Sequence, residues 1–475
     1  MASERRQRTQ HRRSAGGAAG LGAERIRRVA PLAGLTARVA GDAARVALSD
    51  QAGVEFHARA AERYAELLGR SKGALMKAGQ LFSYAAVRSA IAPELQSVYQ
   101  AAFERLRCDA PPMEPELARE TLERELGSRA CAAFAEFEPE PLAAASIGQV
   151  HAARLADGRE VAVKIQYPGA ERAIRADLEN AQLLASVVTL LLGGLFPRRR
   201  RLDLAGVARE VGLRIVEELD YRIEARNQAE FAEHYRGHPF IHVPHILEEL
   251  SGRRVLTQEL VRGRSWGEAL EAPQELRDRW AEAIHRFLYG SLHRLHRLNA
   301  DPHPGNLVFH DDGAVSFLDF GSVLRLGGED VELLVSIYRA CLRNDVKGTW
   351  QASVEAGLWR ATDPVTPEEV FSYWRGDNAL FWAPERFVAS PDYVARGISR
   401  RFSPTGPSAN ALRHCTFPPR LAMMIRIEIA LMSIIGWLRA GADWGSFAAE
   451  YCEDAAPVTP LGRRELDFFA QRGGR

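Results

Sequence analysis

The residues best suited to chemistry lie between positions 301 and 321. The run Asp-Pro-His-Pro-Gly-Asn from Asp301 to Asn306 is followed, after a gap of twelve residues, by Asp319-Phe320-Gly321. Hard cations prefer oxygen ligands, and a carboxylate together with an amide carbonyl can hold Mg²⁺ against phosphate oxygens. We therefore expect Asn306 and Asp319 to hold metal and Asp301 to orient or deprotonate a hydroxyl group. One such acid alone is usually a turn or cap residue, so only the joint pattern favours a Mg²⁺-nucleotide site.

Lys164 is the second candidate, because it is one of only four lysines and ends a Val-Ala-Val-Lys run that alternates like a strand. An unpaired ammonium on a sheet face is costly, and a carboxylate and a phosphate would remove that cost. We expect Glu224 to supply the carboxylate. On one continuous helix Glu224 would share a face with Asp220, where like charges repel unless cations are close. A solvated acidic helix face is the alternative interpretation.

Two stretches could contact the nucleotide through their backbones. The first precedes the lysine strand and consists of Ala143, Ala144, Ala145 and Ser146. Its amides could contact phosphates, although Ala enters positive φ less readily than Gly. The second reads as a strand that leads into a linker, where backbone groups near Glu259 and Val261 could bind an adenine edge. An ordinary edge strand explains this second stretch equally well.

The elements that position these residues are helices around a small sheet. From about 43 to 127, apolar residues repeat at the three- and four-residue spacing of helices. The period changes near 134, where Asp157-Gly158 predicts a hairpin between two strands. Further strands are expected at 242–247, 253–260, 307–310 and 315–318, and further helices at 169–196, 203–235, 273–298 and after 329. This order predicts an α+β fold in two lobes.

Composition excludes several classes of protein. The 475 residues include 62 Lys plus Arg and 61 Asp plus Glu, with 46% hydrophobic residues, which is unlike a disordered tail, a fibre or a nucleic-acid-binding protein. Five scattered cysteines without C-x-x-C spacing argue against a disulfide framework or zinc site and for a reducing cytoplasm. The apolar run 181–196 is too short to span a membrane, and 421–439 is interrupted by Arg426 and Glu428. No spanning helix is expected.

Two basic segments raise the question of a membrane surface. Residues 1–28 hold eight arginines, and Arg198 to Arg201 follow the apolar run 181–196. Both can be solvated segments, the first as a disordered arm and the second as an exposed loop. Alternatively, both could contact an anionic membrane, since each basic residue near such a surface adds about 1 kcal/mol.

In their order along the chain, these motifs resemble the UbiB/AarF/ADCK group of atypical protein-kinase-like proteins. The most diagnostic match is Lys77-Ala78-Gly79-Gln80, the K-x-G-Q signature of that group. It is followed by the Ala-rich loop, the lysine strand, Glu218-Leu219-Asp220 as E-x-D, Glu224, the Asp301 loop and Asp-Phe-Gly. The resemblance covers roughly residues 60–330 well and the C-terminal helices loosely.

The resemblance implies a two-lobed protein-kinase-like fold. Its expected parts are a basic arm (1–40), a helical extension packed across the lobes (41–130), an N-lobe (131–262) and a helical C-lobe (263–475). Lys77 and Gln80 would face Glu218 and Asp220 over the place where a protein substrate docks in an ordinary kinase, which would exclude a peptide.

The activity implied is that of an ATP- and Mg²⁺-dependent ATPase or a phosphotransferase acting on a small or lipid-linked molecule. Lys164 would contact the α- and β-phosphates, Glu224 would position Lys164, and Asp301 would be the catalytic carboxylate. The group is linked to isoprenoid-quinone or lipid metabolism, which implies partner enzymes and peripheral membrane contact.

One departure and two alternatives accompany this prediction. Gly148 stands where the group commonly has Ala, which is expected to loosen the Ala-rich loop and alter nucleotide preference. A small-molecule kinase of the aminoglycoside or choline type has similar catalytic loops, but K-x-G-Q and the extra N-terminal helices argue against it. A non-catalytic, nucleotide-gated scaffold that stabilises partner enzymes at a membrane is the other alternative.

Overall fold

The computed structural model describes residues 113–145, 147–178, 216–376, 379–383, 385–403, 405–416 and 418–473. The chain divides into two compact units, residues 1–71 with 92–109 and residues 72–91 with 110–475, and all described residues belong to the second. Several predictions lie outside the described residues: the basic arm, Lys77, Gln80, Ser146, the apolar run 181–196 and Arg198 to Arg201.

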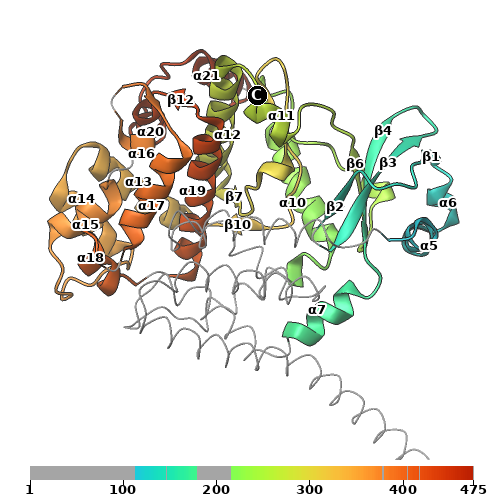
Figure 1. Cartoon of the computed structure of the whole chain (residues 1–475), viewed down its shortest axis with the longest axis horizontal. Coiled ribbons are helices and arrows are strands. Elements are labelled where there is room, and N and C mark those ends of the chain that lie inside the picture. Colours follow the sequence, from blue (N-terminus) through green and yellow to red (C-terminus); the bar gives the residue numbers. More distant parts are fainter. Residues whose placement is uncertain are drawn as a thin grey trace, which may run out of the picture. The chain divides into compact units, whose positions relative to one another are not determined.

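A five-stranded antiparallel sheet carries the lysine strand. Its strands β1 (Phe134–Phe137), β3 (Gly148–Leu155), β4 (Glu160–Gln166) and β6 (Val255–Glu259) lie in that order, and β2 (Ala143–Ala145) pairs with β3. Helices α5 (Pro115–Leu126) and α6 (Ser128–Cys131) precede the sheet and lie near β1 (Figure 1). The predicted hairpin at Asp157-Gly158 joins β3 to β4, and Gly158 adopts a φ of 89° that suits glycine.

The two faces of β4 differ in chemistry. Val161, Val163 and Ile165 are buried in an apolar cluster that also holds Leu122 of α5. Lys164 lies between these residues in sequence, so its side chain points to the opposite face, as the alternation predicted. The apolar face anchors the strand, and the other face presents the ammonium.

The segment between β4 and β6 differs from two predictions. Helix α7 (Ala170–Leu178) begins as expected, but the helix predicted to run through 235 is interrupted, and α10 (Tyr221–His234) starts only after Asp220. Asp220 is the N-cap, because its carboxylate accepts the backbone N–H of Arg222. The predicted strand 242–247 shrinks to β5 (Ile241–His242), since Pro244 has no N–H for a ladder. A short turn of 3-10 helix, η1 (Glu248–Leu250), then leads to β6.

The predicted catalytic loops lie between a long helix and short strands. The long helix is α12 (Gln274–Leu295), which follows α11 (Trp266–Leu270). The loops are flanked by β7 (Arg297–Asn299), the 3-10 turn η2 (Pro304–Asn306), β8 (Leu307–Phe309), β9 (Val315–Phe317) and β10 (Val323–Arg325). β7 pairs with β10, and β5, β9 and β8 form a three-stranded sheet, so the hairpin predicted from 307 to 318 is present.

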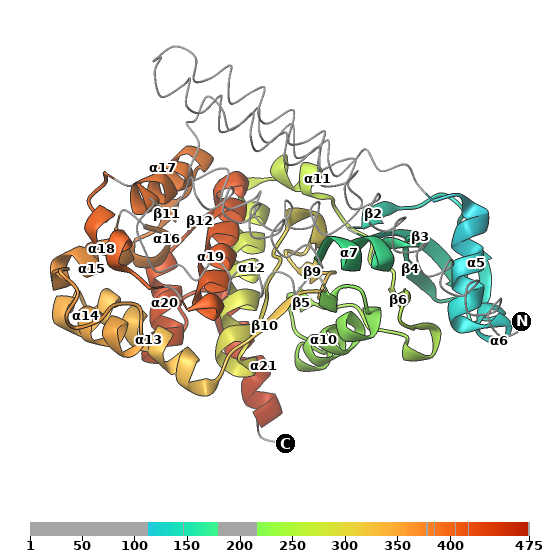
Figure 2. The ribbon, with the colours of Figure 1, turned by 90° about the horizontal axis from the view of Figure 1, so that it is seen from below.

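The remainder of the chain is helical, as predicted. Its helices are α13 (Gly328–Leu342), α14 (Val346–Glu355), α15 (Pro367–Arg375), α16 (Ala379–Trp382), α17 (Pro391–Phe402), α18 (Ala409–His414), α19 (Pro419–Leu438), α20 (Trp444–Glu453) and α21 (Pro460–Gly473). Two-residue strands β11 (Phe387–Val388) and β12 (Gly441–Ala442) pair among them. The apolar helix α19 lies against α12 (Figure 2) and buries Ile427, Ile434 and Ile435. Within the described ranges, no helix is both long and apolar enough to cross a bilayer.

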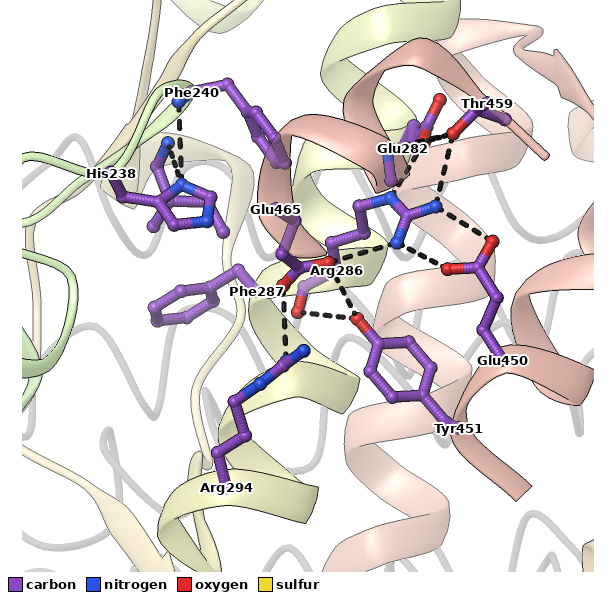
Figure 3. Close-up of polar contacts among 12 residues, drawn as sticks. His238, Phe240, Glu282, Arg286, Phe287, Arg294, Glu450, Tyr451, Thr459 and Glu465 are labelled. Carbon is purple, nitrogen blue, oxygen red and sulfur yellow. Dashed lines mark hydrogen bonds and ion pairs between the residues drawn. The ribbon is translucent and has the colours of Figure 1, made fainter. Parts of the chain in front are cut away.

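A buried arginine joins the last two helices to α12 (Figure 3). Arg286 is 1% exposed and contacts three carboxylates: Glu282 at 2.7 Å, Glu450 of α20 at 2.8 Å and Glu465 of α21 at 3.0 Å. Arg294 supplies a second cation, 3.2 Å from the other oxygen of Glu465. Removing one member of such a buried network leaves the others uncompensated, so these contacts fix α20 and α21 to the helix that leads into the catalytic loop.

Candidate functional site

The predicted pairing of Lys164 with Glu224 is present. Lys164 Nζ lies 2.8 Å from one carboxylate oxygen of Glu224 and 2.9 Å from the other. Glu224 belongs to the first turn of α10 and its side chain is only 4% exposed. The ion pair therefore joins the sheet to α10 across a largely dry contact, where its geometry is well defined.

Asp319 is the third member of the group. Its Oδ2 lies 3.4 Å from Lys164 Nζ, and its Oδ1 accepts the backbone N–H of Gly321 at 2.9 Å. The side chain of Asp319 is 33% exposed, in contrast with that of Glu224. Glu224 therefore faces the interior, whereas the carboxylate of Asp319 is partly exposed, where a metal ion or a phosphate can approach.

The ammonium of Lys164 stays protonated in this setting. Burial is the largest single influence and acts to lower its pKa, but the negative charges of Asp319 and Glu224 together outweigh burial and hold the pKa of Lys164 well above its ordinary value. The ring of Tyr221 lies 5.1 Å from Nζ and adds a cation–π contact. Lys164 is thus a fixed positive charge suited to contacting phosphate oxygens.

Three carboxyl groups gather in this part of the site. A Cβ placed on Gly321 would lie 3.2 Å from Asp319 Oδ1, 3.5 Å from Glu224 Oε2 and 3.6 Å from Glu218 Cγ, so the three acids surround this glycine. Among the described residues, Lys164 forms ion pairs with two of them, Glu224 and Asp319. Such a group of carboxylates attracts a divalent cation. Across the described ranges, however, no three His, Cys, Asp or Glu side chains converge closely enough to hold an ion by themselves.

Asn306 lies beside the strand that delivers Asp319. The backbone carbonyl of Asn306 accepts the N–H of Leu318 at 3.0 Å, because the β8–β9 hairpin folds one loop against the other. The preceding turn is held by His303, whose Nδ1 accepts the N–H of Gly305 at 2.9 Å. The hairpin thus places the backbone of Asn306 beside Leu318, the residue directly before Asp319.

Two asparagines that the sequence analysis did not single out fix the Asp-Phe-Gly segment. Asn299 donates to the carbonyl of Asp319 at 2.7 Å, and Asn227 of α10 donates to the carbonyl of Phe320 at 3.0 Å. Asn299 also accepts the backbone N–H of Asp301 at 3.0 Å, so one side chain connects both catalytic loops. The sequence offered one signal, an Asn two residues before Asp301. Its partner Asp319 lies 20 residues further along the chain, so the contact could not be read from spacing.

Asp301 is held by an arginine that the sequence analysis treated only as an interruption of an apolar helix. Arg426 of α19 places NH2 at 2.7 Å from Asp301 Oδ1 and NH1 at 2.6 Å from the carbonyl of Ala300. The charge within the apolar run 421–439 was the available signal. Its target could not be read from spacing, because 125 residues separate the partners.

The Ala-rich stretch is a tight hairpin rather than an open loop. β2 pairs with β3 so that Ala144 lies opposite Gln149 and Ala145 opposite Gly148. A Cβ on Gly148 would lie only 2.2 Å from the carbonyl oxygen of Ile165, so glycine is required by the close approach of β4. The expectation that Gly148 loosens this stretch is therefore wrong at this position, because the residue is a packed strand residue.

The E-x-D acids occupy different environments. Glu218 is 9% exposed and lies in the acidic group described above. Asp220 accepts Arg222 NH2 at 2.6 Å, and the hydrogen bond from Arg222 is the main reason that the pKa of Asp220 is lowered. Asp220 is therefore paired locally, and the repulsion expected from a shared helix face with Glu224 is wrong, since Asp220 precedes the helix.

The predicted adenine contacts lie at the end of β6. The backbone N–H of Glu259 donates to the carbonyl of His245 at 2.9 Å, so it is not available to a nucleotide. The carboxylate of Glu259 lies 3.3 Å from His242 Nε2, and this hydrogen bond lowers its pKa. The N–H of Glu259 is therefore excluded from the backbone groups that were predicted to bind an adenine edge.

Comparisons with known proteins agree with this architecture. The model of the ABC1 atypical kinase-like domain matches residues 105–353. The chain is 34% identical over 304 residues to "Atypical kinase coq-8, mitochondrial" of Caenorhabditis elegans, covering 63% of this chain and 38% of that protein. It is 32% identical over 262 residues to "Probable protein kinase UbiB" of Marinobacter nauticus, covering 54% of this chain and 47% of that protein. The chain thus matches less than half the length of each of these two relatives.

A solved structure extends the similarity over most of the chain. "The complex structure of Rv3197-erythromycin from Mycobacterium tuberculosis" superposes with a TM-score of 0.60 at 30% identity, covering 84% of this chain and 97% of that one. The predicted α+β, kinase-like fold and the resemblance to the UbiB/AarF/ADCK group are both confirmed. With its family model matching more than half of its residues, the chain belongs to the family of ABC1 atypical kinase-like proteins.

Proposed function

We propose that the protein binds ATP with Mg²⁺ and acts as an ATPase or as a phosphotransferase for a small or lipid-linked molecule. The observation that carries the proposal is Lys164, held at 2.8 Å from Glu224 and 3.4 Å from Asp319 between the sheet and the Asp-Phe-Gly segment. A lysine paired in this way contacts the α- and β-phosphates in kinases. The Ala-rich hairpin of Ala143 to Ala145 precedes that strand and is the proposed phosphate cover.

The metal would be held by Asp319 and Asn306. The fit rests on the partly exposed carboxylate of Asp319 and on the three carboxyl groups around Gly321. A Mg²⁺ ion held by these two residues would supply positive charge against the negative charge of the phosphates. Lys164 would orient the phosphates, Glu224 would keep Lys164 in place, and Asp301 would orient the attacking hydroxyl or water through its carboxylate.

The ion pair at Asp301 also supports a second candidate function. Arg426 already occupies Asp301 Oδ1 at 2.7 Å, so this oxygen is engaged before any substrate binds. Very slow turnover, or a nucleotide-gated scaffold for partner enzymes, is consistent with this contact. The resemblance to the UbiB/AarF/ADCK group supports an association with isoprenoid-quinone metabolism. The basic segments outside the described residues remain the proposed membrane contacts.

A thermal-shift titration with ATP, ADP and GTP, with and without Mg²⁺, tests the nucleotide site. Ligand at about a hundred times its dissociation constant adds roughly 2.7 kcal/mol, which is a readable shift. We expect a Mg²⁺-dependent shift with adenine nucleotides in the wild type that Asp319→Asn abolishes. Asp311→Asn is the matched control, because Asp311 is 78% exposed at the turn of the same hairpin.

The outcomes separate the two candidates. Binding together with ATP hydrolysis supports the enzyme, and binding without turnover supports the scaffold. No shift with any nucleotide, or equal shifts in the wild type and Asp319→Asn, would count against both.

A further inference from the structure

A cavity lies among the C-terminal helices. It encloses about 370 Å³ and is bounded by residues of α15, α17 and α19 and by the turn that leads into α18. This volume lies in the range of small-molecule sites. Lys164, Glu224, Asp301 and Asp319 do not line the cavity, so the proposed nucleotide site leaves it unexplained.

The walls of the cavity are mostly apolar. Tyr373 and Trp374 come from α15, Val394 and Ile398 from α17, and Ile429 from α19. These residues are largely buried in the C-lobe core, so packed side chains form the apolar walls of the cavity. An occupant would therefore exchange water for apolar contacts along much of its length.

The polar part of the lining is strongly biased in charge. Arg375, Arg400 and Arg401 line the cavity, whereas no Asp or Glu is among its described lining residues. Arg375 already has a hydrogen-bond acceptor, because its NH1 donates to the carbonyl of Cys341 at 2.7 Å. A wall to which the described residues contribute several cations and no anion favours a negatively charged occupant.

Arg401 is the most informative of the three arginines. Its Nε and NH2 are buried and make no hydrogen bond of standard geometry with a described residue, although the hydroxyl of Tyr373 lies close to the guanidinium. The guanidinium instead lies 4.7 Å from the ring centre of Tyr373 and 5.4 Å from that of Trp374. Aromatic faces stabilise a cation only partly, and a buried donor without an acceptor is unfavourable. Arginine is common in the last turn of a helix, but that preference is satisfied at the surface and does not require burial beside two rings.

We propose that this cavity binds an anionic amphiphile, a molecule with one apolar chain and a carboxylate or phosphate head. The chain would occupy the space among Tyr373, Val394, Ile398 and Ile429, and the head would accept hydrogen bonds from Arg401. A charge-assisted hydrogen bond to a carboxylate or phosphate is the interaction that this guanidinium lacks. This site is independent of the proposed nucleotide function.

Calorimetric titration of the full chain with four probes tests the proposal. Decanoate and decyl phosphate carry chain and charge, 1-decanol carries the chain alone, and inorganic phosphate carries the charge alone. We expect one molecule of decanoate or decyl phosphate to bind per protein, 1-decanol to bind at least about tenfold more weakly, and phosphate not to bind. Asp319→Asn should bind decanoate as the wild type does, which separates this site from the nucleotide site.

The variants assign the head group to Arg401. Arg401→Gln should weaken decanoate binding at least about tenfold, while Arg401→Lys should retain part of it. Arg396→Gln is the matched control, because Arg396 lies on the same helix, is exposed and does not line the cavity. Ile429→Trp should block binding by filling the cavity, which keeps the test decisive if Arg401→Gln does not fold.

Three results would overturn the proposal: no binding of either charged probe, equal affinities for decanoate and 1-decanol, or unchanged decanoate affinity in the folded Arg401→Gln and Ile429→Trp proteins. Binding of inorganic phosphate as tightly as decyl phosphate would also overturn it, since it would indicate a simple anion site.

Discussion

Arg426 of the apolar helix α19 holds Asp301 of the catalytic loop with two contacts, one to the carboxylate at 2.7 Å and one to the carbonyl of Ala300 at 2.6 Å. The guanidinium therefore fixes both the side chain and the backbone of the loop. It also connects the loop to the C-terminal helices, because α19 packs on α12 and α17. The catalytic carboxylate of the proposed mechanism is thus oriented by a residue from outside the motifs that define the family resemblance.

Arg426→Gln should lower ATP turnover about 10- to 100-fold while nucleotide affinity stays within about twofold, because small displacements of a catalytic group are costly. Arg426→Lys should restore part of the rate. Arg343→Gln, an exposed arginine paired with Glu453, is the control. A fall in nucleotide affinity with no change in turnover would contradict the positioning role.

Glu224→Gln tests the central ion pair. Breaking a buried pair costs about 3–5 kcal/mol, and Lys164 would retain only Asp319 at 3.4 Å. We expect a lower unfolding temperature and a nucleotide affinity reduced at least about tenfold, measured by thermal unfolding and calorimetry. Glu233→Gln on the exposed side of the same helix should change neither. Unchanged nucleotide affinity in Glu224→Gln would refute its positioning of Lys164.

Gly148→Ala tests the packing of the Ala-rich hairpin. The new Cβ would lie 2.2 Å from the carbonyl oxygen of Ile165, so β3 must move away from the strand that carries Lys164. We expect a loss of about 1–3 kcal/mol in the free energy of unfolding, together with weaker nucleotide binding. Gly267→Ala is the control, because nothing lies within 4 Å of a Cβ at that position. Equal stability of the two variants would show that the strands adjust without cost.

Residue patterns were sufficient for the parts of the site that depend on local structure. The alternation of Val-Ala-Val-Lys assigned Lys164 to the polar face of a strand, and turn residues located the hairpins at Asp157-Gly158 and before Asp319. The start of α10 was misplaced because Asp220, as an N-cap, carries the same charge as an ordinary helix acid. Arg426 and Asn227 could not be assigned, since their partners are set by packing between distant segments.

The buried carboxyl group of Glu428 should give the free energy of unfolding an unusual pH dependence. It is 4% exposed on α19, hydrogen-bonds with the hydroxyl of Tyr338, and burial raises its pKa to about 8. An unfolded Glu ionises near pH 4.3, so between about pH 4.3 and pH 8 the folded protein holds a proton that the unfolded chain has lost. The contribution of Glu428 to the free energy of unfolding therefore falls as pH rises through this window, by at most about 1.4 kcal/mol per pH unit.

Glu428→Gln removes this titration and keeps an acceptor for Tyr338, so its stability relative to the wild type should increase steadily from pH 5 to pH 8. Unfolding temperatures of both proteins at four pH values measure the difference. Glu332→Gln, an exposed acid on α13, should show no such trend. A constant difference between wild type and Glu428→Gln across the window would mean that the carboxyl group is ionised in the folded protein, with a compensating charge nearby.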